Sequence, residues 1–212
     1  MTRERARTVH LVVATVAWFA LVLQLVLVLQ GGRVLDEVDP PGLVARTYRY
    51  FAYFTIQSNI LVAVTSTLLA RDPARDGPGF RVARLAALVG ITVTGLVHFV
   101  LLRPLLDLQG ADWICDKLLH MVVPVAAVAA WAVVGPRPRA GLRVAAYALA
   151  WPVAWLGWTL VIGQVDGWVP YPFLDPATGY GSVAIYSLVI FVATVVVGAL
   201  VFALSRVRIV KP

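Results

Sequence analysis

Cysteine, histidine, lysine and acidic residues are all scarce in this 212-residue chain. The single cysteine, Cys115, excludes an intrachain disulfide and any metal cluster that is held by several cysteines. Charged residues make up only 14% of the sequence, and hydrophobic residues make up 60%. An ordinary soluble domain has about 25% charged residues. Because a water-soluble fold cannot bury so much apolar surface, the composition excludes an ordinary soluble domain.

The connections between the apolar stretches are short. Residues 71–80 and 135–141 are rich in proline, glycine and arginine, and they leave no room for a soluble catalytic domain. The sequence also has no low-complexity tract, no heptad seam and no internal repeat of the kind found in inverted-repeat transporters. Any chemistry must therefore take place within a membrane or at its outer rim.

Six apolar stretches are long enough to cross a bilayer, whose hydrocarbon core needs about 20 residues per helix. They cover residues 10–29, 50–69, 82–102, 114–134, 142–162 and 183–204. The first is preceded by basic residues, as in a signal peptide, but it is long for one and no Ala-x-Ala cleavage site follows it. We expect an all-α polytopic membrane protein with six transmembrane helices, folded as a single domain over residues 1–212.

The basic residues are distributed unevenly between the two sides that six spans define. One side holds 13 of the 18 lysine and arginine residues: Arg3, Arg5, Arg7, Arg71, Arg75, Arg81, Arg84, Arg137, Arg139, Arg143, Arg206, Arg208 and Lys211. The other side holds Arg33, Arg46, Arg49, Arg103 and Lys117, with eight of the eleven acids: Asp36, Glu37, Asp39, Asp107, Asp112, Asp116, Asp166 and Asp175. Because cytoplasmic loops carry an excess of positive charge, this split predicts cytoplasmic termini and argues against a nucleic-acid partner. Sixteen arginines against two lysines are typical of a GC-rich bacterial genome, which favours a bacterial cytoplasmic membrane.

A polar stripe interrupts the second apolar stretch. At helical spacing Thr55, Ser58 and Asn59 share one face, and Ser66 falls on the same face two turns later. Gln57 lies opposite Thr55 and is expected to face a different neighbour. Since hydrocarbon cannot satisfy polar groups, the stripe should face protein, a cavity or a bound ligand.

Polar groups from other spans fall at the same depth when the topology is applied. Thr55 lies about 9 Å and His98 about 8 Å below the outer boundary at 1.5 Å per residue, and His120 lies at a similar depth. Gln164 and Asp166 close the fifth span on that side. The sequence therefore predicts one polar layer in the outer leaflet.

This layer contains the parts of a nucleophilic site. Imidazole can take the proton of a hydroxyl nucleophile, so His120 could act as base for Thr55. Asp116, one helical turn before His120, could orient the ring. Asn59 could donate an amide N–H to an oxyanion, and Pro124 removes a backbone bond to the His120 carbonyl and could open the helix there.

Each of these groups also has a structural interpretation. A membrane threonine usually bonds the carbonyl one turn earlier, and a buried histidine often links helices. Asn59 and Gln57 could act as interhelical hydrogen-bonding residues. Asp116 could pair with Lys117 or Arg103. These alternatives stay open at the level of sequence.

Three segments together resemble a known family. They are Tyr53-Phe54-Thr55, then Leu118-Leu119-His120 followed by Pro124, and Trp168-Val169-Pro170-Tyr171-Pro172-Phe173-Leu174. The pattern is similar to the androgen-induced protein family, above all its bacterial branch of six-transmembrane-helix proteins, over nearly the whole chain. Eukaryotic members are membrane threonine hydrolases of fatty acid esters of hydroxy fatty acids. The resemblance implies Thr55 as nucleophile and His120 as its base.

The sequence and the resemblance together predict an intramembrane hydrolase of lipid esters with a fatty-acyl ligand and no required metal or redox cofactor. Ser58, Asn59, His98 and Asp116 are expected to support the Thr55–His120 pair. Four residues are expected to bind substrate: Gln57, Trp168, Tyr171 and Phe173. The aromatic segment that begins at Trp168 should fold over the site as a lid, or else form an aromatic belt. Two other classes remain as alternatives: a non-catalytic lipid-binding or transport protein, and a redox protein with His98 and His120 as haem or quinone ligands.

Overall fold

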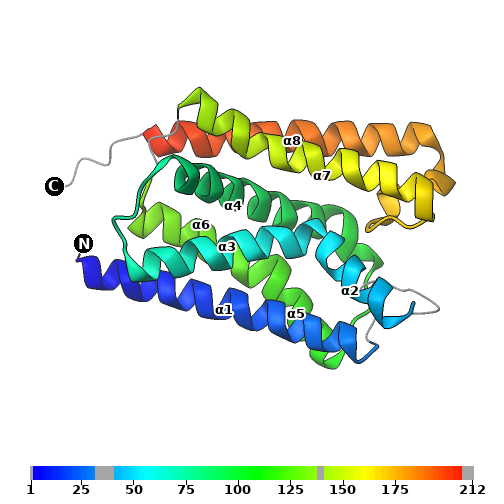
Figure 1. Cartoon of the computed structure of the whole chain (residues 1–212), viewed down its shortest axis with the longest axis horizontal. Helices are drawn as coiled ribbons and strands as arrows, with labels where there is room; N and C mark the ends of the chain where they lie inside the picture. Colours follow the sequence, from blue (N-terminus) through cyan, green and yellow to red (C-terminus); the bar gives the residue numbers. More distant parts are fainter. Residues whose placement is uncertain (1, 32–40, 138–140, 207–212) are drawn as a thin grey trace.

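A computed structural model describes residues 2–31, 41–137 and 141–206 of the chain. Regular structure in these ranges is helical throughout (Figure 1). The α-helices are α1 (Arg3–Leu29), α2 (Leu43–Ala52), α3 (Phe54–Arg71), α4 (Pro78–Val97), α5 (Gly110–Lys117), α6 (Val123–Val134), α7 (Leu142–Asp166) and α8 (Tyr180–Arg206). Shorter turns are the π-helical η1 (His98–Leu102) and η3 (Leu118–Val122) and the 3₁₀ turns η2 (Arg103–Leu105), η4 (Pro172–Leu174) and η5 (Pro176–Thr178).

Five continuous helical segments are long and apolar enough to cross a membrane: Arg3–Leu29, Pro78–Leu105, Gly110–Val134, Leu142–Asp166 and Tyr180–Ser205. The bent pair α2 and α3 makes a sixth if it is counted as one span. The expected all-α class is therefore confirmed, and the helices fit an integral membrane protein. Seven charged residues used in the topology prediction lie outside the described residues: Arg33, Asp36, Glu37, Asp39, Arg139, Arg208 and Lys211.

Helix α4 lies at the centre of the bundle, packed against α3, α6, α7 and α8, while α1 covers α3 and α6 (Figure 1). The side chains of Ala87, Leu88 and Ile91 on α4 are fully buried. The start of α1 and the end of α8 lie at one end of the bundle, with the turn between α3 and α4. The other end carries the segment between α7 and α8, where the predicted polar layer should lie.

The second predicted span is not a continuous helix. Tyr53 has an extended backbone (φ −64°, ψ 128°), and α2 meets α3 there at an angle of 66°. The carbonyls of Phe51 and Ala52, which a continuous helix would use internally, accept hydrogen bonds from Gln57 Nε2 at 3.0 Å and Trp155 Nε1 at 2.8 Å. Side chains from α3 and α7 thus satisfy the broken backbone, as a membrane requires.

The break places Thr55 in the first turn of a helix. Because α3 begins at Phe54, the first N–H groups of α3 have no carbonyl one turn earlier within that helix. The partial positive charge of a helix N-terminus therefore lies beside the Thr55 side chain. Sequence periodicity gave no sign of this arrangement.

Both site histidines lie in π-helical turns, His98 in η1 and His120 in η3. Pro124 follows η3 closely, in accord with the expected local opening of that helix. A Cβ atom at Gly95 of α4 would lie 3.3 Å from Pro124 Cβ and 3.4 Å from the His120 carbonyl oxygen. Glycine at that position lets α4 approach the histidine turn closely.

Candidate active site

Thr55 and His120 are in contact. Thr55 Oγ1 lies 3.2 Å from His120 Nε2, although the two residues are 65 positions apart in sequence. Thr55 is buried at the start of α3, and His120 is partly exposed in η3. This distance is within the range expected for a nucleophile and its base. The sequence left this contact open and the structure places the two atoms together, while the catalytic roles of the two residues stay predictions.

Asp116 holds the other side of the imidazole ring. His120 Nδ1 lies 3.0 Å from Asp116 Oδ1 and 3.1 Å from the Asp116 carbonyl oxygen. With the Nδ1 proton donated to Asp116, the Nε2 lone pair faces the Thr55 hydroxyl. Lys117 Nζ donates to Asp116 Oδ2 at 2.6 Å. Asp116 therefore both orients the His120 ring and pairs with Lys117, because one carboxylate oxygen contacts His120 and the other accepts from Lys117.

His98 joins this cluster from η1, the π-helical turn that follows α4. Its ring stacks on that of His120, with centroids 4.1 Å apart and an interplanar angle of 9°. Its Nδ1 lies 3.6 Å from Asp116 Oδ1, and neither ring nitrogen has a hydrogen-bond partner among the described residues. His98 therefore contacts His120 by stacking, which restricts the plane of the His120 ring, and it takes no part in the hydrogen bonds of the cluster.

His98, Asp116 and His120 also form the group of possible metal ligands in the described part of the chain, with ligand atoms within 4.8 Å of one another. A metal ion lies in the plane of each imidazole that binds it, about 2.0–2.1 Å from nitrogen for zinc. Two stacked, parallel rings do not direct their lone pairs at one point, so the observed ring positions do not fit a shared ion. They do not fit axial haem ligation either, because such ligands approach the iron from opposite faces of the macrocycle.

Tyr171 completes the surroundings of Thr55. Its hydroxyl oxygen lies 3.3 Å from Thr55 Oγ1 and accepts from the Thr55 backbone N–H at 3.3 Å. Burial raises the pKa of the Tyr171 hydroxyl, so the group stays protonated well into the alkaline range. The sequence predicted Tyr171 as a substrate contact and missed this bond. The flanking Pro170 and Pro172 were the available signal for a rigid segment.

The oxyanion role expected for Asn59 is contradicted by its contacts. Asn59 Nδ2 donates to the Thr55 carbonyl at 2.8 Å and to the Leu119 carbonyl at 3.2 Å, so both amide hydrogens are engaged. Asn59 instead ties α3 to η3 and holds Thr55 beside His120. The Tyr171 hydroxyl, 3.3 Å from Thr55 Oγ1, is a donor within reach of this oxygen.

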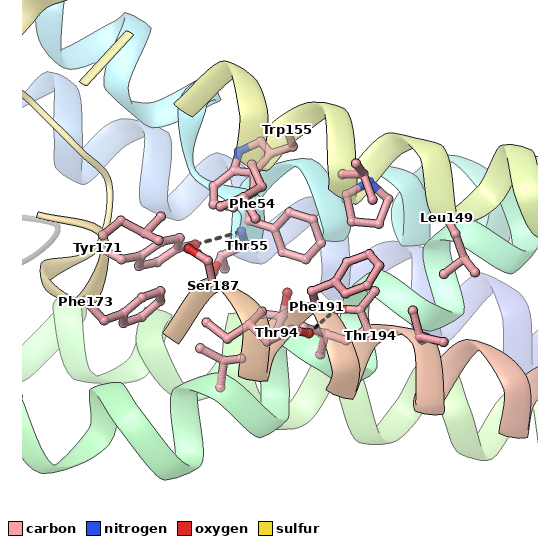
Figure 2. A pocket seen from close by; sticks show the side chains of 18 of the residues that line it. Phe54, Thr55, Thr94, Leu149, Trp155, Tyr171, Phe173, Ser187, Phe191 and Thr194 are labelled. Carbon is pink, nitrogen blue, oxygen red and sulfur yellow. Dashed lines mark hydrogen bonds between the residues drawn. The ribbon is translucent and has the colours of Figure 1, made fainter. Parts of the chain in front are cut away.

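An apolar groove begins at Thr55 and continues between α4, α7 and α8 (Figure 2). Its volume is about 90 Å³. Along α8 its lining extends from Ser187 to Val195, which is about 12 Å at the helical rise. Tyr171 and Phe173 close the end nearest Thr55, their rings stacked 5.2 Å apart. The groove has the shape and chemistry to hold an alkyl chain.

A second, smaller cavity of about 50 Å³ lies on the other side of Thr55, and we call it the polar chamber. Its polar lining comprises Gln24, Tyr50, Tyr53, Thr55, His98, Asp112, Asp116, His120 and Tyr171. Thr55, Leu102 and Tyr171 line both cavities. His120 lines only the chamber. Thr55 therefore lies between an apolar groove and a chamber with a mixed lining, in which polar side chains stand among leucine and isoleucine.

Two residues expected to bind substrate are placed elsewhere. Gln57 lines neither cavity, because its amide donates to Phe51 and accepts from Trp151 Nε1 at 3.0 Å. Trp168 also lines neither, since its ring packs on Tyr53 and beneath the Arg49 guanidinium. Both predictions are corrected: Gln57 stabilises the break in the helix, and Trp168 anchors the aromatic segment.

The rest of the predicted polar layer divides into site and packing residues. Ser58 is fully buried against α4, where a Cβ at Gly90 would lie 2.9 Å from its Oγ. Gln164 contacts Tyr180 at 3.5 Å, and Asp166 accepts from the Trp168 N–H at 2.9 Å, both outside the site. The prediction from membrane depth therefore included residues, such as Gln164 and Asp166, that the tertiary structure does not bring to the site.

Comparisons of the chain with models of protein families, with curated proteins and with solved structures find no match. The resemblance to the androgen-induced protein family stays a prediction.

Proposed function

We propose that the protein is an intramembrane hydrolase of fatty-acyl esters, as in the family it resembles, with Thr55 as nucleophile and His120 as general base. The observation that carries this proposal is the continuous chain of contacts from Asp116 through His120 to Thr55, located where an apolar groove begins. A threonine with a purely structural role would bond a carbonyl of its own helix. The Thr55 hydroxyl contacts a histidine and a tyrosine instead.

The first half of the reaction acylates Thr55. His120 Nε2 removes the hydroxyl proton as Thr55 Oγ1 forms a bond to the ester carbonyl carbon. The carbonyl π electrons move to oxygen, and the resulting oxyanion faces the Tyr171 hydroxyl, which lies 3.3 Å from Thr55 Oγ1. Collapse of this intermediate breaks the bond to the alcohol oxygen, which takes the proton from His120. Asp116 stabilises the imidazolium throughout.

The second half returns the free enzyme. A water molecule gives a proton to His120 Nε2 and attacks the acyl carbon, and the bond to Thr55 Oγ1 then breaks as this oxygen regains the proton. The products are a fatty acid and the restored threonine. Water would approach this carbon from the polar chamber, because His120 Nε2, which must take its proton, lines the chamber and does not line the groove.

We further propose that both termini face the cytoplasm of a bacterium, which puts the site in the outer leaflet. The arginine-rich end of the bundle supports this orientation, since Arg7 of α1 donates to the Arg71 carbonyl at 3.0 Å and positive charge favours the cytoplasmic side. A periplasmic alkaline phosphatase fused after Pro212 should be inactive. An active fusion would reverse the orientation and leave the chemistry of the site unaffected.

The decisive experiment replaces Thr55 and a matched threonine on the same helix. Thr55→Ala should abolish hydrolysis of acyl esters in the purified full-length protein, while Thr55→Ser keeps measurable turnover because the attacking oxygen remains. Thr65→Ala is the control, since Thr65 is equally buried on α3 but bonds the Leu61 carbonyl at 2.7 Å. Esters of several acyl lengths should be assayed. Full activity in folded Thr55→Ala would disprove the mechanism and favour a lipid-binding or transport protein.

A further inference from the structure

The polar chamber contains two polar side chains that the fold does not use. Gln24 of α1 and Asp112 of α5 both line it, and neither has a hydrogen-bond or ion-pair partner among the described residues. Both are partly buried. Most other polar groups around the chamber are engaged: Tyr50 donates to the Leu21 carbonyl, and Asp116 binds His120 and Lys117. The chamber thus offers a free carboxylate and a free amide beside the candidate nucleophile.

The position of His120 determines which part of an ester would enter the chamber. His120 must deliver a proton to the departing alcohol oxygen, so the alcohol leaves on the side where His120 lies. His120 lines the chamber and does not line the apolar groove. The acyl chain therefore occupies the groove, and the alcohol occupies the chamber.

The chemistry and size of the chamber restrict that alcohol. At about 50 Å³ against about 90 Å³ for the groove, it has less space for a second long chain. An apolar alcohol would remove water from Gln24 and Asp112 without replacing their hydrogen bonds, which is unfavourable. Hydroxyl groups can donate to the Asp112 carboxylate and to the Gln24 carbonyl and can accept from the Gln24 amide.

We propose that the polar chamber is an alcohol subsite for a small, hydroxylated alcohol, and that the substrates are acyl esters of glycerol-like polyols. This inference rests on the proposed ester hydrolysis at Thr55. It differs from the two-chain esters that the family resemblance implies, because it assigns one long chain to the groove and a short polar group to the chamber.

The test compares two esters of one fatty acid with the purified full-length protein: the 1-glyceryl ester and the propyl ester. Both alcohols have three carbons, and only glycerol keeps two free hydroxyls after esterification. The wild-type protein should hydrolyse the glyceryl ester with a kcat/KM about tenfold or more above that of the propyl ester, because only glycerol satisfies the chamber groups. Asp112→Leu and Gln24→Leu should each bring this ratio toward one.

Asp107→Leu is the matched control, since Asp107 is exposed and lies outside the chamber lining; its ratio should equal that of the wild type. The proposed subsite would be wrong if the wild-type protein hydrolysed the glyceryl ester with a kcat/KM no higher than that of the propyl ester. It would also be wrong if the protein preferred a choline ester of the same fatty acid to the glyceryl ester. These outcomes leave the hydrolase intact if Thr55→Ala still removes turnover of the propyl ester. Hydrolysis that persists in Thr55→Ala, or no hydrolysis of any ester by the wild type, would overturn the proposed function and the subsite together.

Discussion

The two ends of the helix bundle each place a histidine near charged groups, but the contacts differ. At the site end, contacts continue from Lys117 through Asp116 and His120 to Thr55. At the opposite end, His10 Nε2 contacts the Gly135 carbonyl at 2.8 Å, while His10 Nδ1 and all three nitrogens of the fully buried Arg84 guanidinium have no hydrogen-bond partner among the described residues.

Only the site end has the arrangement that chemistry requires. Neither His10 nor Arg84 lines the groove or the chamber, whereas Thr55 lines both. A buried ionisable residue in a membrane span is a functional candidate by default. The comparison shows that burial alone is insufficient, because a reaction also needs a nucleophile within reach of a base and a space for substrate.

The largest effect should follow from removing the base at the site end. We expect His120→Ala to lower kcat by about 10²–10⁴-fold, the usual contribution of general base catalysis. The Thr55→Ala, His120→Ala double variant should be scarcely worse than either single variant, because members of one catalytic unit are non-additive. Steady-state kinetics checks both, with His10→Ala as the control histidine. Additive losses would mean that Thr55 and His120 do not act together.

Removing the Tyr171 hydroxyl should have the next largest effect. Tyr171→Phe keeps the stacking on Phe173 but loses the donor near the oxyanion, so we expect kcat to fall by about 10²–10³-fold, as for other single oxyanion donors. Phe173→Leu tests packing without a polar change and should alter KM more than kcat. If Tyr171→Phe changes only KM, the tyrosine serves to bind substrate.

Neutralising Asp116 should cost less. The His120 Nδ1 proton has a second acceptor in the Asp116 carbonyl at 3.1 Å, which keeps the ring in the useful tautomer without the carboxylate. We expect Asp116→Asn to lower kcat by about 10–10²-fold, against about 10⁴-fold where a carboxylate alone fixes the tautomer. Steady-state kinetics with one acyl ester measures this loss. An unchanged kcat would assign Asp116 to packing.

The smallest effect on turnover should come from the opposite end. Arg84→Met removes a buried charge that has no hydrogen-bond partner among the described residues, so kcat should be unchanged. The free energy of unfolding should stay the same or rise by up to about 4 kcal/mol, as when other buried charges are replaced by apolar residues. Thermal unfolding in detergent measures this. Reduced turnover in a folded Arg84→Met protein would contradict this prediction and would show that Arg84 influences the site at the other end of the bundle.

The broken second span shows where sequence reasoning failed. Periodicity over residues 50–69 predicted one helix, and the break at Tyr53 depends on a hydrogen bond from Trp155, about 100 positions later in the chain. Gln57 was predicted as a substrate contact for the same reason: its partners, the Phe51 carbonyl and Trp151, exist only because the helix is broken and α7 packs beside it.

The sequence by itself determined the helical class and the approximate spans, because apolar length is a local property. The four-residue spacing of Asp116 and His120 also fixed their shared face. Only the tertiary structure decided that α3 and η3 are neighbours, that Tyr171 returns to Thr55, and that a groove and a chamber meet there. These features depend on side-chain packing between distant segments, and helical periodicity carries no information about which segments pack together.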